Sequence, residues 1–514
     1  MRRRALALAG VLGFLALVHG LPHVPGDVPD SPAAAYPELA RRAVDAAAGD
    51  DHPYPLHVDE HYHMARMAQI DRQAKVEIDD PYTGEPAGSG LFTTVSGFRT
   101  ERGFDLAVAQ VAQLTGADLA ALFRFVPALW SAYLGLTLWL VLRPAPGALA
   151  AAAFTAMLPT TVRFLGVGFL VPSAFALPWI LATLHVALHG RGGGRFFGLV
   201  LLITGAHFMH LVIGVLCIVT GLLAMMLRGG ALRDRLAVAA GVLLPLLWIV
   251  PAAREDIVAA VSSEHTLPFA QDVFLVPGML VYTLVVAGAL AAVMRGDAAT
   301  RPHRVLLALA VLLAASMAVS IALGHRNDAT YSRVVHAFFL ALAALAGLGL
   351  AVAVRTAARL APERSRRPVA AAAVAAVAAV ALAFPVQALL AEPYYHVFDE
   401  PSWRRVQAFA ASPAGPDDTF LAHPWQAPVL TAVSGARPYA VLYPGAPPLN
   451  GEDYTHYLAT EGADADWLAD REIAYVVAPV EPGAEHAVLA AGVYKIAAVT
   501  PEITPFPLET SETP

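Results

Sequence analysis

Long apolar runs, separated by short polar or arginine-containing segments, make up most of the sequence. A helix that crosses a membrane needs about 20 mostly apolar residues, because the lipid interior cannot satisfy unpaired backbone groups. The runs that meet or approach this length are about eleven, near residues 5–20, 121–142, 147–162, 172–188, 196–209, 211–227, 236–253, 273–294, 305–323, 334–354 and 369–391. The chain is therefore predicted to be a polytopic α-helical membrane protein.

The composition excludes several other classes of protein. Charged residues make up 15% of the chain, whereas a soluble domain carries about 25%. A net charge of −7 argues against a nucleic-acid partner. The single cysteine, Cys217, can form neither an intramolecular disulfide nor a thiolate metal cluster.

Arginines are concentrated in alternate connections between the apolar runs, which predicts the orientation of the chain. The basic positions are Arg2, Arg3, Arg4, Arg143, Arg191, Arg195, Arg228, Arg233, Arg235, Arg295, Arg301, Arg304, Arg355, Arg359, Arg364, Arg366 and Arg367. Because basic loops stay in the cytoplasm, the N-terminus is predicted to be cytoplasmic and the C-terminus extracytoplasmic, in the plasma membrane. The first run is interpreted as a retained signal anchor, with a cleaved signal peptide as the alternative.

This orientation leaves two large segments outside the cell. The tail alternates a helical pattern at 403–411 with short β-like runs at 419–422 and 474–478, which is typical of a small α/β domain. The predicted parts are a first transmembrane helix (1–20), a first external loop (21–120), a multispan membrane domain (121–391) and an external C-terminal α/β domain (392–514).

Two adjacent carboxylates, Asp59 and Glu60, lie in the first external loop just before a helix-like run at 64–70. Such a pair can bind a divalent ion or act as a general base on an acceptor. The alternative is an acidic cap at the start of a helix. Composition and spacing alone leave both interpretations open.

Other ionisable residues add two weaker hypotheses. His57, His61 and His63 have a two-residue spacing that would suit one face of a strand, and there they could act as ligands of a zinc ion. Ionisable groups near the predicted outer ends of later spans are Arg163, His207, His210, Glu264 and Arg333. Such groups are costly at membrane depth and usually face a cavity. Alternatively, they reach the membrane interface, or, for the loop residue Glu264, are simply solvated.

The order of these features resembles the GT-C membrane glycosyltransferases, and most of all the catalytic subunits of archaeal and bacterial oligosaccharyltransferases. The first external loop of that family is similar to the segment Asp59-Glu60-His61-Tyr62-His63-Met64-Ala65-Arg66 followed by Asp80-Pro81-Tyr82. Ser262-Ser263-Glu264 is similar to the Ser/Thr-x-x-Glu motif, although the glutamate comes one residue early. Arg333 matches an arginine that opens a late span.

Two family motifs are missing. Where the resemblance predicts Trp-Trp-Asp-Tyr-Gly, this chain has His423-Pro424-Trp425-Gln426-Ala427. Where it predicts a metal-binding Gly-x-x-Asp-x-Asp/Glu, the chain has Gly168-Phe169-Leu170-Val171-Pro172. The resemblance therefore supports neither recognition of an Asn-x-Ser/Thr acceptor nor a two-centre metal site.

The resemblance implies transfer of a sugar or oligosaccharide, with inversion, from a polyprenyl phosphate-linked donor to a protein, lipid or glycan acceptor. Asp59 is the expected base and Glu60 its assistant, with Mg²⁺ or Mn²⁺ as an optional ligand of Asp59. Glu264 is expected to bind the acceptor. The residues expected to pair with the donor phosphate are Arg333, Arg163, His207 and His210.

Two other classes of protein remain as alternatives. The missing acidic motif would suit a non-catalytic GT-C-like binding or scaffold subunit. A secondary transporter is the second alternative, but the sequence has no repeat of spans and no carboxylate or lysine in the middle of a span.

Overall fold

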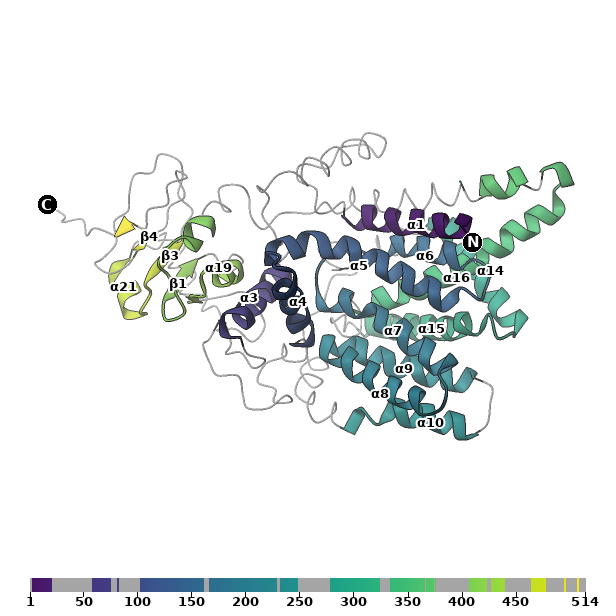
Figure 1. Ribbon diagram of the computed structural model, residues 1–514, viewed down its shortest axis with the longest axis horizontal. Helices are drawn as coiled ribbons and strands as arrows, with labels where there is room; N and C mark the ends of the chain where they lie inside the picture. The colour runs from purple at the N-terminus through teal and green to yellow at the C-terminus, as the bar shows by residue number, and fades with distance from the viewer. Residues whose placement is uncertain are drawn as a thin grey trace. The chain divides into compact units, whose positions relative to one another are not determined.

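The computed structural model consists of two compact units (Figure 1). It describes residues 2–20, 58–74, 81–82, 102–160, 166–228, 232–247, 278–323, 333–365, 367–373, 375, 406–422, 427–439, 464–477, 494–495 and 506–507. Unit 1 comprises Met1–Gly49, Thr100–Phe104 and Arg124–Tyr394, and unit 2 comprises Asp50–Arg99, Asp105–Phe123 and Tyr395–Pro514.

Unit 1 is a bundle of apolar helices. Six described helices are long and apolar enough to cross a membrane: α5 (Leu119–Leu142, whose first turn is assigned to unit 2), α7 (Pro172–His189), α8 (Gly192–Met209), α14 (Gly278–Arg295), α15 (Arg301–Ala322) and α16 (Arg333–Leu360). The shorter helices of this unit are α1 (Arg2–Gly20), α6 (Ala148–Phe154) with the 3₁₀ turn η3 (Thr155–Met157), α9 (Leu211–Leu227) and α10 (Leu232–Leu243).

A helix lies at each of the first ten predicted runs, while most of the run at 369–391 falls outside the described residues. The count of about eleven spans therefore stays a prediction. One run is shorter than expected, because helical structure ends at Met157 rather than continuing to 162. Leu158 is extended and precedes Pro159, and the residue before a proline is sterically kept out of helical backbone angles.

Glycines allow α14 and α16 to pack with their backbones in direct contact. A Cβ atom at Gly288 would collide with the carbonyl group of Leu345, and one at Gly349 would collide with that of Leu284. Small residues at helix crossings are the usual means of close packing in membranes. Large apolar side chains such as Leu290 and Met294 are exposed on the outer side of α14, as expected for a surface that faces lipid.

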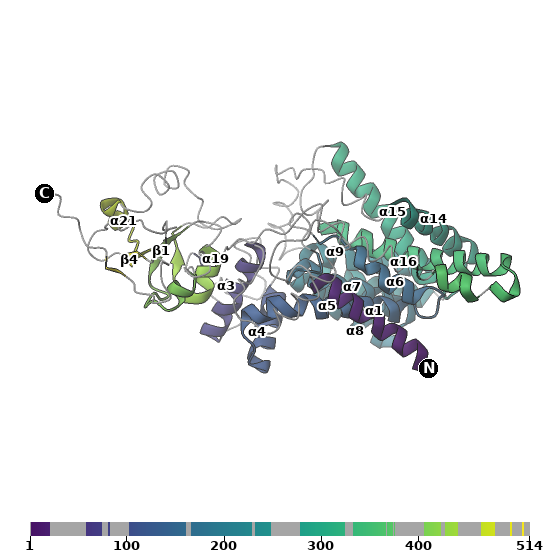
Figure 2. The same ribbon diagram turned by 90° about the horizontal axis from the view of Figure 1, so that it is seen from above.

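Unit 2 combines helices with a small mixed sheet (Figure 2). Its helices are α3 (Val58–Gln73), most of α4 (Arg102–Thr115), α19 (Ala427–Ser434) and α21 (Ala465–Asp470). The strands are β1 (Thr419–Ala422), β2 (Arg437–Pro438), β3 (Tyr475–Val477), β4 (Tyr494–Lys495) and β5 (Phe506–Pro507), in the spatial order β2-β1-β3-β4-β5. All neighbouring pairs are parallel except β4 and β5.

The two predicted β-like runs of the tail form central strands of this sheet. Phe420 of β1 lies opposite Tyr475 of β3, and both side chains are buried beside Phe409. On the helical side, Arg72 of α3 donates a 2.9 Å hydrogen bond to the carbonyl oxygen of Ala432 in α19. A segment of the first loop and a segment of the tail thus belong to one packed unit, although about 360 residues separate them.

Candidate functional site

The two candidate carboxylates lie in the first turn of α3, which begins at Val58. Negative side chains stabilise this end of a helix because they face its unpaired backbone amides. The strand interpretation of the nearby histidines is wrong, because residues 58–73 are helical. Residues two positions apart in a helix are separated by about 200° around its axis, so His61 and His63 point to different faces. His57 lies outside the described residues.

The first two turns of α3 bury an unusual number of ionisable side chains. Glu60 and His61 are 0% exposed, His63 is 2% exposed and Arg66 is 6% exposed. Asp59 is intermediate between buried and exposed. Buried charges require partners, because removing them from water costs several kcal/mol per ion. Asp59 is therefore the more accessible of the two carboxylates, and Glu60 belongs to the buried part of the helix.

A third carboxylate, Asp105 of α4, holds two of these buried side chains. His63 Nδ1 lies 2.8 Å from Asp105 Oδ1, and Arg66 Nε lies 3.2 Å from Asp105 Oδ2. Asp105 is itself only 1% exposed. His63 and Arg66 are three residues apart and therefore share a helix face, so one carboxylate can bind both. The sequence motifs do not point to Asp105 as part of this site.

Tyrosines join the second motif of the first loop to α3. The rings of Tyr62 and Tyr82 are stacked, with centroids 5.1 Å apart, and the Tyr82 hydroxyl donates a 3.3 Å hydrogen bond to the carbonyl oxygen of Tyr62. The Arg66 guanidinium carbon lies 5.7 Å from the centroid of the Tyr62 ring. The segments that contain Asp59 and Tyr82 are thus parts of one local arrangement.

A cleft of about 490 Å³ adjoins the later turns of α3. It is lined mainly by methionine and alanine side chains of α3, α4 and α19, including Met64, Met67 and Ala109. Asp71 lies in this lining and accepts a 2.9 Å hydrogen bond from Gln113 Nε2. Asp59 and Glu60 do not line it, so the cleft is separate from the candidate carboxylates.

The two histidines predicted to contact phosphate occupy the junction of α8 and α9. His207 is 4% and His210 5% exposed. His210 is the N-cap of α9, and its Nδ1 accepts a 3.4 Å hydrogen bond from the amide of Ile213. Acceptance at Nδ1 places the proton of a neutral ring on Nε2. Any hydrogen bond from this ring to a phosphate would therefore come from Nε2.

The remaining predicted site residues are distributed between the units or lie outside the described residues. Arg333 is the first residue of α16 and is half-buried. Arg163 and Glu264 are outside the described residues. Asp59 and Glu60 belong to unit 2, whereas His207, His210 and Arg333 belong to unit 1. The convergence of these residues on one cavity stays a prediction.

Metal binding at Asp59 also stays a prediction. Among the residues that the structure describes, no three His, Cys, Asp or Glu side chains are grouped so that they could hold a metal ion. Carboxylate oxygens are the ligands that Mg²⁺ and Mn²⁺ prefer, and Asp59 and Glu60 supply that chemistry.

Known structures show which fold this is, although no protein-family model and no curated protein sequence matches the chain. The oligosaccharyltransferase AglB from Archaeoglobus fulgidus, in complex with an inhibitory peptide and a dolichol-phosphate, is 12% identical with a TM-score of 0.54, over 91% of this chain and 69% of its own. The apo oligosaccharyltransferase from the same organism is 13% identical with a TM-score of 0.52 over 85% of this chain. The arabinofuranosyltransferase AftD from Mycobacteria is 16% identical with a TM-score of 0.50, over 93% of this chain and 35% of its own.

These similarities establish the architecture of the chain. The chain spans 64% of the length of the apo oligosaccharyltransferase structure that it matches. All three are glycosyltransferases of the GT-C type. The fold is therefore that of the GT-C membrane glycosyltransferases, as the resemblance of the first external loop predicts.

Proposed function

We propose that this chain, which has the GT-C fold, is a membrane glycosyltransferase that uses a polyprenyl phosphate-linked sugar or oligosaccharide. The acceptor is a protein, lipid or glycan on the extracytoplasmic side. The dolichol-phosphate bound to the structurally similar AglB supports a lipid-linked donor. The observation that carries the proposal is the position of Asp59 in the first turn of α3, directly before side chains that buried Asp105 holds in place.

In the proposed reaction, the acceptor nucleophile attacks the anomeric carbon of the donor sugar. The bond from that carbon to the phosphate oxygen breaks, and the lipid phosphate leaves with the electron pair, which inverts the configuration. Half-buried Asp59 accepts the proton of the nucleophile, and general-base assistance of this kind contributes about 10²–10⁴-fold. Fully buried Glu60 orients Asp59 or a cation rather than the acceptor.

Cationic groups stabilise the leaving phosphate in this proposal. Arg333 and Arg163 suit this role because a guanidinium can donate two parallel hydrogen bonds to a phosphate. His207 and His210 add neutral donors, and Glu264 binds the acceptor. A divalent cation such as Mg²⁺ or Mn²⁺ would add positive charge at Asp59, and no step of the proposed reaction depends on it.

The test is sugar transfer by the purified full-length protein from a panel of polyprenyl phosphate and polyprenyl diphosphate sugars. Asp59→Asn removes the base while keeping the size of the side chain, and we expect transfer to fall about 10²–10⁴-fold. Asp71→Asn is the matched control, because Asp71 is an exposed carboxylate on the same helix. Parallel reactions with EDTA decide whether the activity needs a metal.

Two results would overturn the proposal. Full activity of Asp59→Asn would remove Asp59 from the chemistry. Absence of transfer from every donor by folded wild-type protein would favour the non-catalytic subunit, and co-purification with a partner from the native membrane would then be the next measurement.

A further inference from the structure

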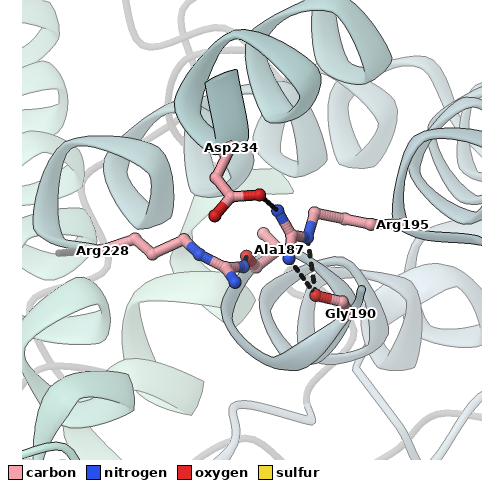
Figure 3. Close-up of polar contacts among 5 residues, drawn as sticks. All are labelled: Ala187, Gly190, Arg195, Arg228 and Asp234. Atoms are coloured by element: carbon pink, nitrogen blue, oxygen red, sulfur yellow. Dashed lines mark hydrogen bonds and ion pairs between the residues drawn. The ribbon is translucent and has the colours of Figure 1, made fainter. Parts of the chain in front are cut away.

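Arg195 and Arg228 lie at the C-terminal end of α7, in the part of unit 1 that the arginine distribution assigns to the cytoplasmic face (Figure 3). We call Arg195, Arg228 and Arg301, together with Asp234, the arginine cluster. Arg195 belongs to α8, Arg228 follows α9, Asp234 belongs to α10 and Arg301 opens α15. Four sequence segments therefore contribute charge to one location.

Arg195 is fully engaged with protein atoms. Its Nε donates a 2.7 Å hydrogen bond to the carbonyl oxygen of Gly190, its Nη2 contacts the same oxygen, and its Nη1 lies 3.3 Å from Asp234 Oδ1. The side chain is 3% exposed. Arg195 thus binds the carbonyl group of the residue that follows α7, where the helix dipole favours a cation, and it is paired with the Asp234 carboxylate.

Arg228 and Arg301 are not matched in the same way. Arg228 Nη1 donates a 2.5 Å hydrogen bond to the carbonyl oxygen of Ala187, and the side chain is half-exposed. Arg301 Nε is buried and has no hydrogen-bond partner among the described residues. Burial lowers the pKa of Arg228; the charges of Arg195 and Arg301 lower it further, while Asp234 raises it. The positive charge of this location therefore exceeds its negative charge.

Two histidines on the last turns of α7 add hydrogen-bond donors beside the arginine cluster. His185 and His189 are exposed, their ring centroids are 5.0 Å apart, and His189 is within electrostatic range of Arg228 and Arg301. Imidazole N–H groups are further hydrogen-bond donors for an anion. Among the residues that the structure describes, Asp234 is the acidic side chain that interacts electrostatically with Arg228.

Exposed apolar side chains border the cluster on the helices that carry it. Phe197 is 64% exposed two residues after Arg195, and Met226 is 68% exposed two residues before Arg228. On α10, Leu232 and Leu236 are 70% and 59% exposed on either side of Asp234. A ligand bound here would contact guanidinium groups with one part and neighbouring apolar side chains with another. This combination matches an amphiphilic anion better than a free one.

We propose that the arginine cluster binds the phosphate of an anionic phospholipid, with the acyl chains against the apolar side chains of α8, α9 and α10. Arg228 and Arg301 donate to the phosphate oxygens, while Arg195 stays on the end of α7 and fixes the site. Basic sites between membrane helices are suited to such headgroups. This site is distinct from the proposed donor site, and the inference does not depend on transferase activity.

The test is binding of dioleoyl phosphatidylglycerol to the full-length protein in detergent, measured by native mass spectrometry and by the lipid-dependent rise in Tm. Dioleoyl phosphatidylcholine and inorganic phosphate are the comparison ligands. We expect phosphatidylglycerol to bind and to raise Tm more than either. Each of Arg228→Gln and Arg301→Gln should weaken binding about fivefold, corresponding to about 1 kcal/mol per basic residue.

Arg233→Gln is the matched control, because Arg233 is an exposed arginine of α10 and its removal changes the net charge equally. We expect it to bind phosphatidylglycerol as the wild type does. Equal losses in Arg233→Gln and Arg228→Gln would overturn the proposal in favour of a diffuse attraction to charge. Equal binding of phosphatidylcholine would overturn it in favour of apolar contact, and an equal effect of inorganic phosphate would show a site for free anions. The Tm of each variant without lipid shows whether it has folded.

Discussion

Removing the carboxylate of Asp105 is expected to loosen the helix that carries the candidate base. In Asp105→Ala, His63 and Arg66 lose the group that both of them contact, and all three residues are at most 6% exposed. A water molecule in the space left by the carboxylate would supply hydrogen bonds but no negative charge. The perturbation therefore acts on α3 without altering Asp59 itself.

Breaking a buried ion pair by removing one partner costs about 3–5 kcal/mol. For Asp105→Ala, which removes contacts of 2.8 and 3.2 Å, we expect the lower end of this range, about 3 kcal/mol. Asp105→Asn keeps the shape and one acceptor oxygen but loses the charge, so we expect about 1.5–2 kcal/mol, the contribution of a hydrogen bond to a charged group. The difference between the two variants measures packing and hydrogen bonding separately from charge.

The assay is amide hydrogen exchange of the full-length protein in detergent, followed over residues 58–73. A local destabilisation of about 3 kcal/mol should speed exchange in α3 by about 100-fold in Asp105→Ala, and one of about 1.5–2 kcal/mol should speed it by about 10–30-fold in Asp105→Asn. Asp71→Ala, which removes an exposed carboxylate and its bond to Gln113, should change exchange less than fivefold. If exchange over 58–73 in Asp105→Ala equals that of the wild type, the cluster does not hold α3.

Two further predictions concern unit 1. Gly288→Ala should lower Tm, because the added methyl group meets the carbonyl group of Leu345 and α14 must move away from α16, at a cost of about 1–3 kcal/mol. Gly13→Ala on α1 is the control, because nothing lies within 4 Å of the added Cβ atom there. Equal Tm values for both variants would contradict the packing argument. The hydroxyl and amide of Thr300 donate hydrogen bonds to exposed Asp297, and these bonds hold the pKa of Asp297 below its usual value. The stability that they provide is therefore present above about pH 4 and is lost as the pH falls through the depressed pKa. The Tm difference between wild type and Asp297→Ala should therefore shrink as the pH is lowered from about 5 through the pKa of Asp297. A difference that is independent of pH would show that the ionised carboxylate does not stabilise the turn at Asp297 and Thr300.

The apolar runs predict the helices well because their physical cause is strong. A membrane-spanning helix satisfies its backbone within itself, so the sequence needs only length and apolar composition, and both are visible. The ends are less predictable, as α6 illustrates: the run continues to 162, but Leu158 and Pro159 end the helix. Strands β1 and β3 follow from β-branched and aromatic residues at 419–422 and 474–478, whereas their order in the sheet depends on contacts between distant segments.

The histidine pattern shows why short spacings are ambiguous. A spacing of two is compatible with a strand, but Asp59 and Glu60 followed by 64–70 also form a helix start with acids in the first turn. The helix is the observed state. It follows that His61 and His63 face in different directions, and only His63 shares a face with Arg66.

Asp105 exposes the limit of motif-based reasoning about this site. In the sequence it is one acid in the first turn of an amphipathic helix, where a capping role is the ordinary interpretation. A signal did exist, since His63 and Arg66 are three residues apart and share one helix face, and buried basic groups require acidic partners. That requirement names the chemistry of the partner but not its position, which is 42 residues away from His63 and set by the packing of α4 on α3. The motif therefore predicts which residue could react, while the residue that fixes it in place is determined by tertiary structure.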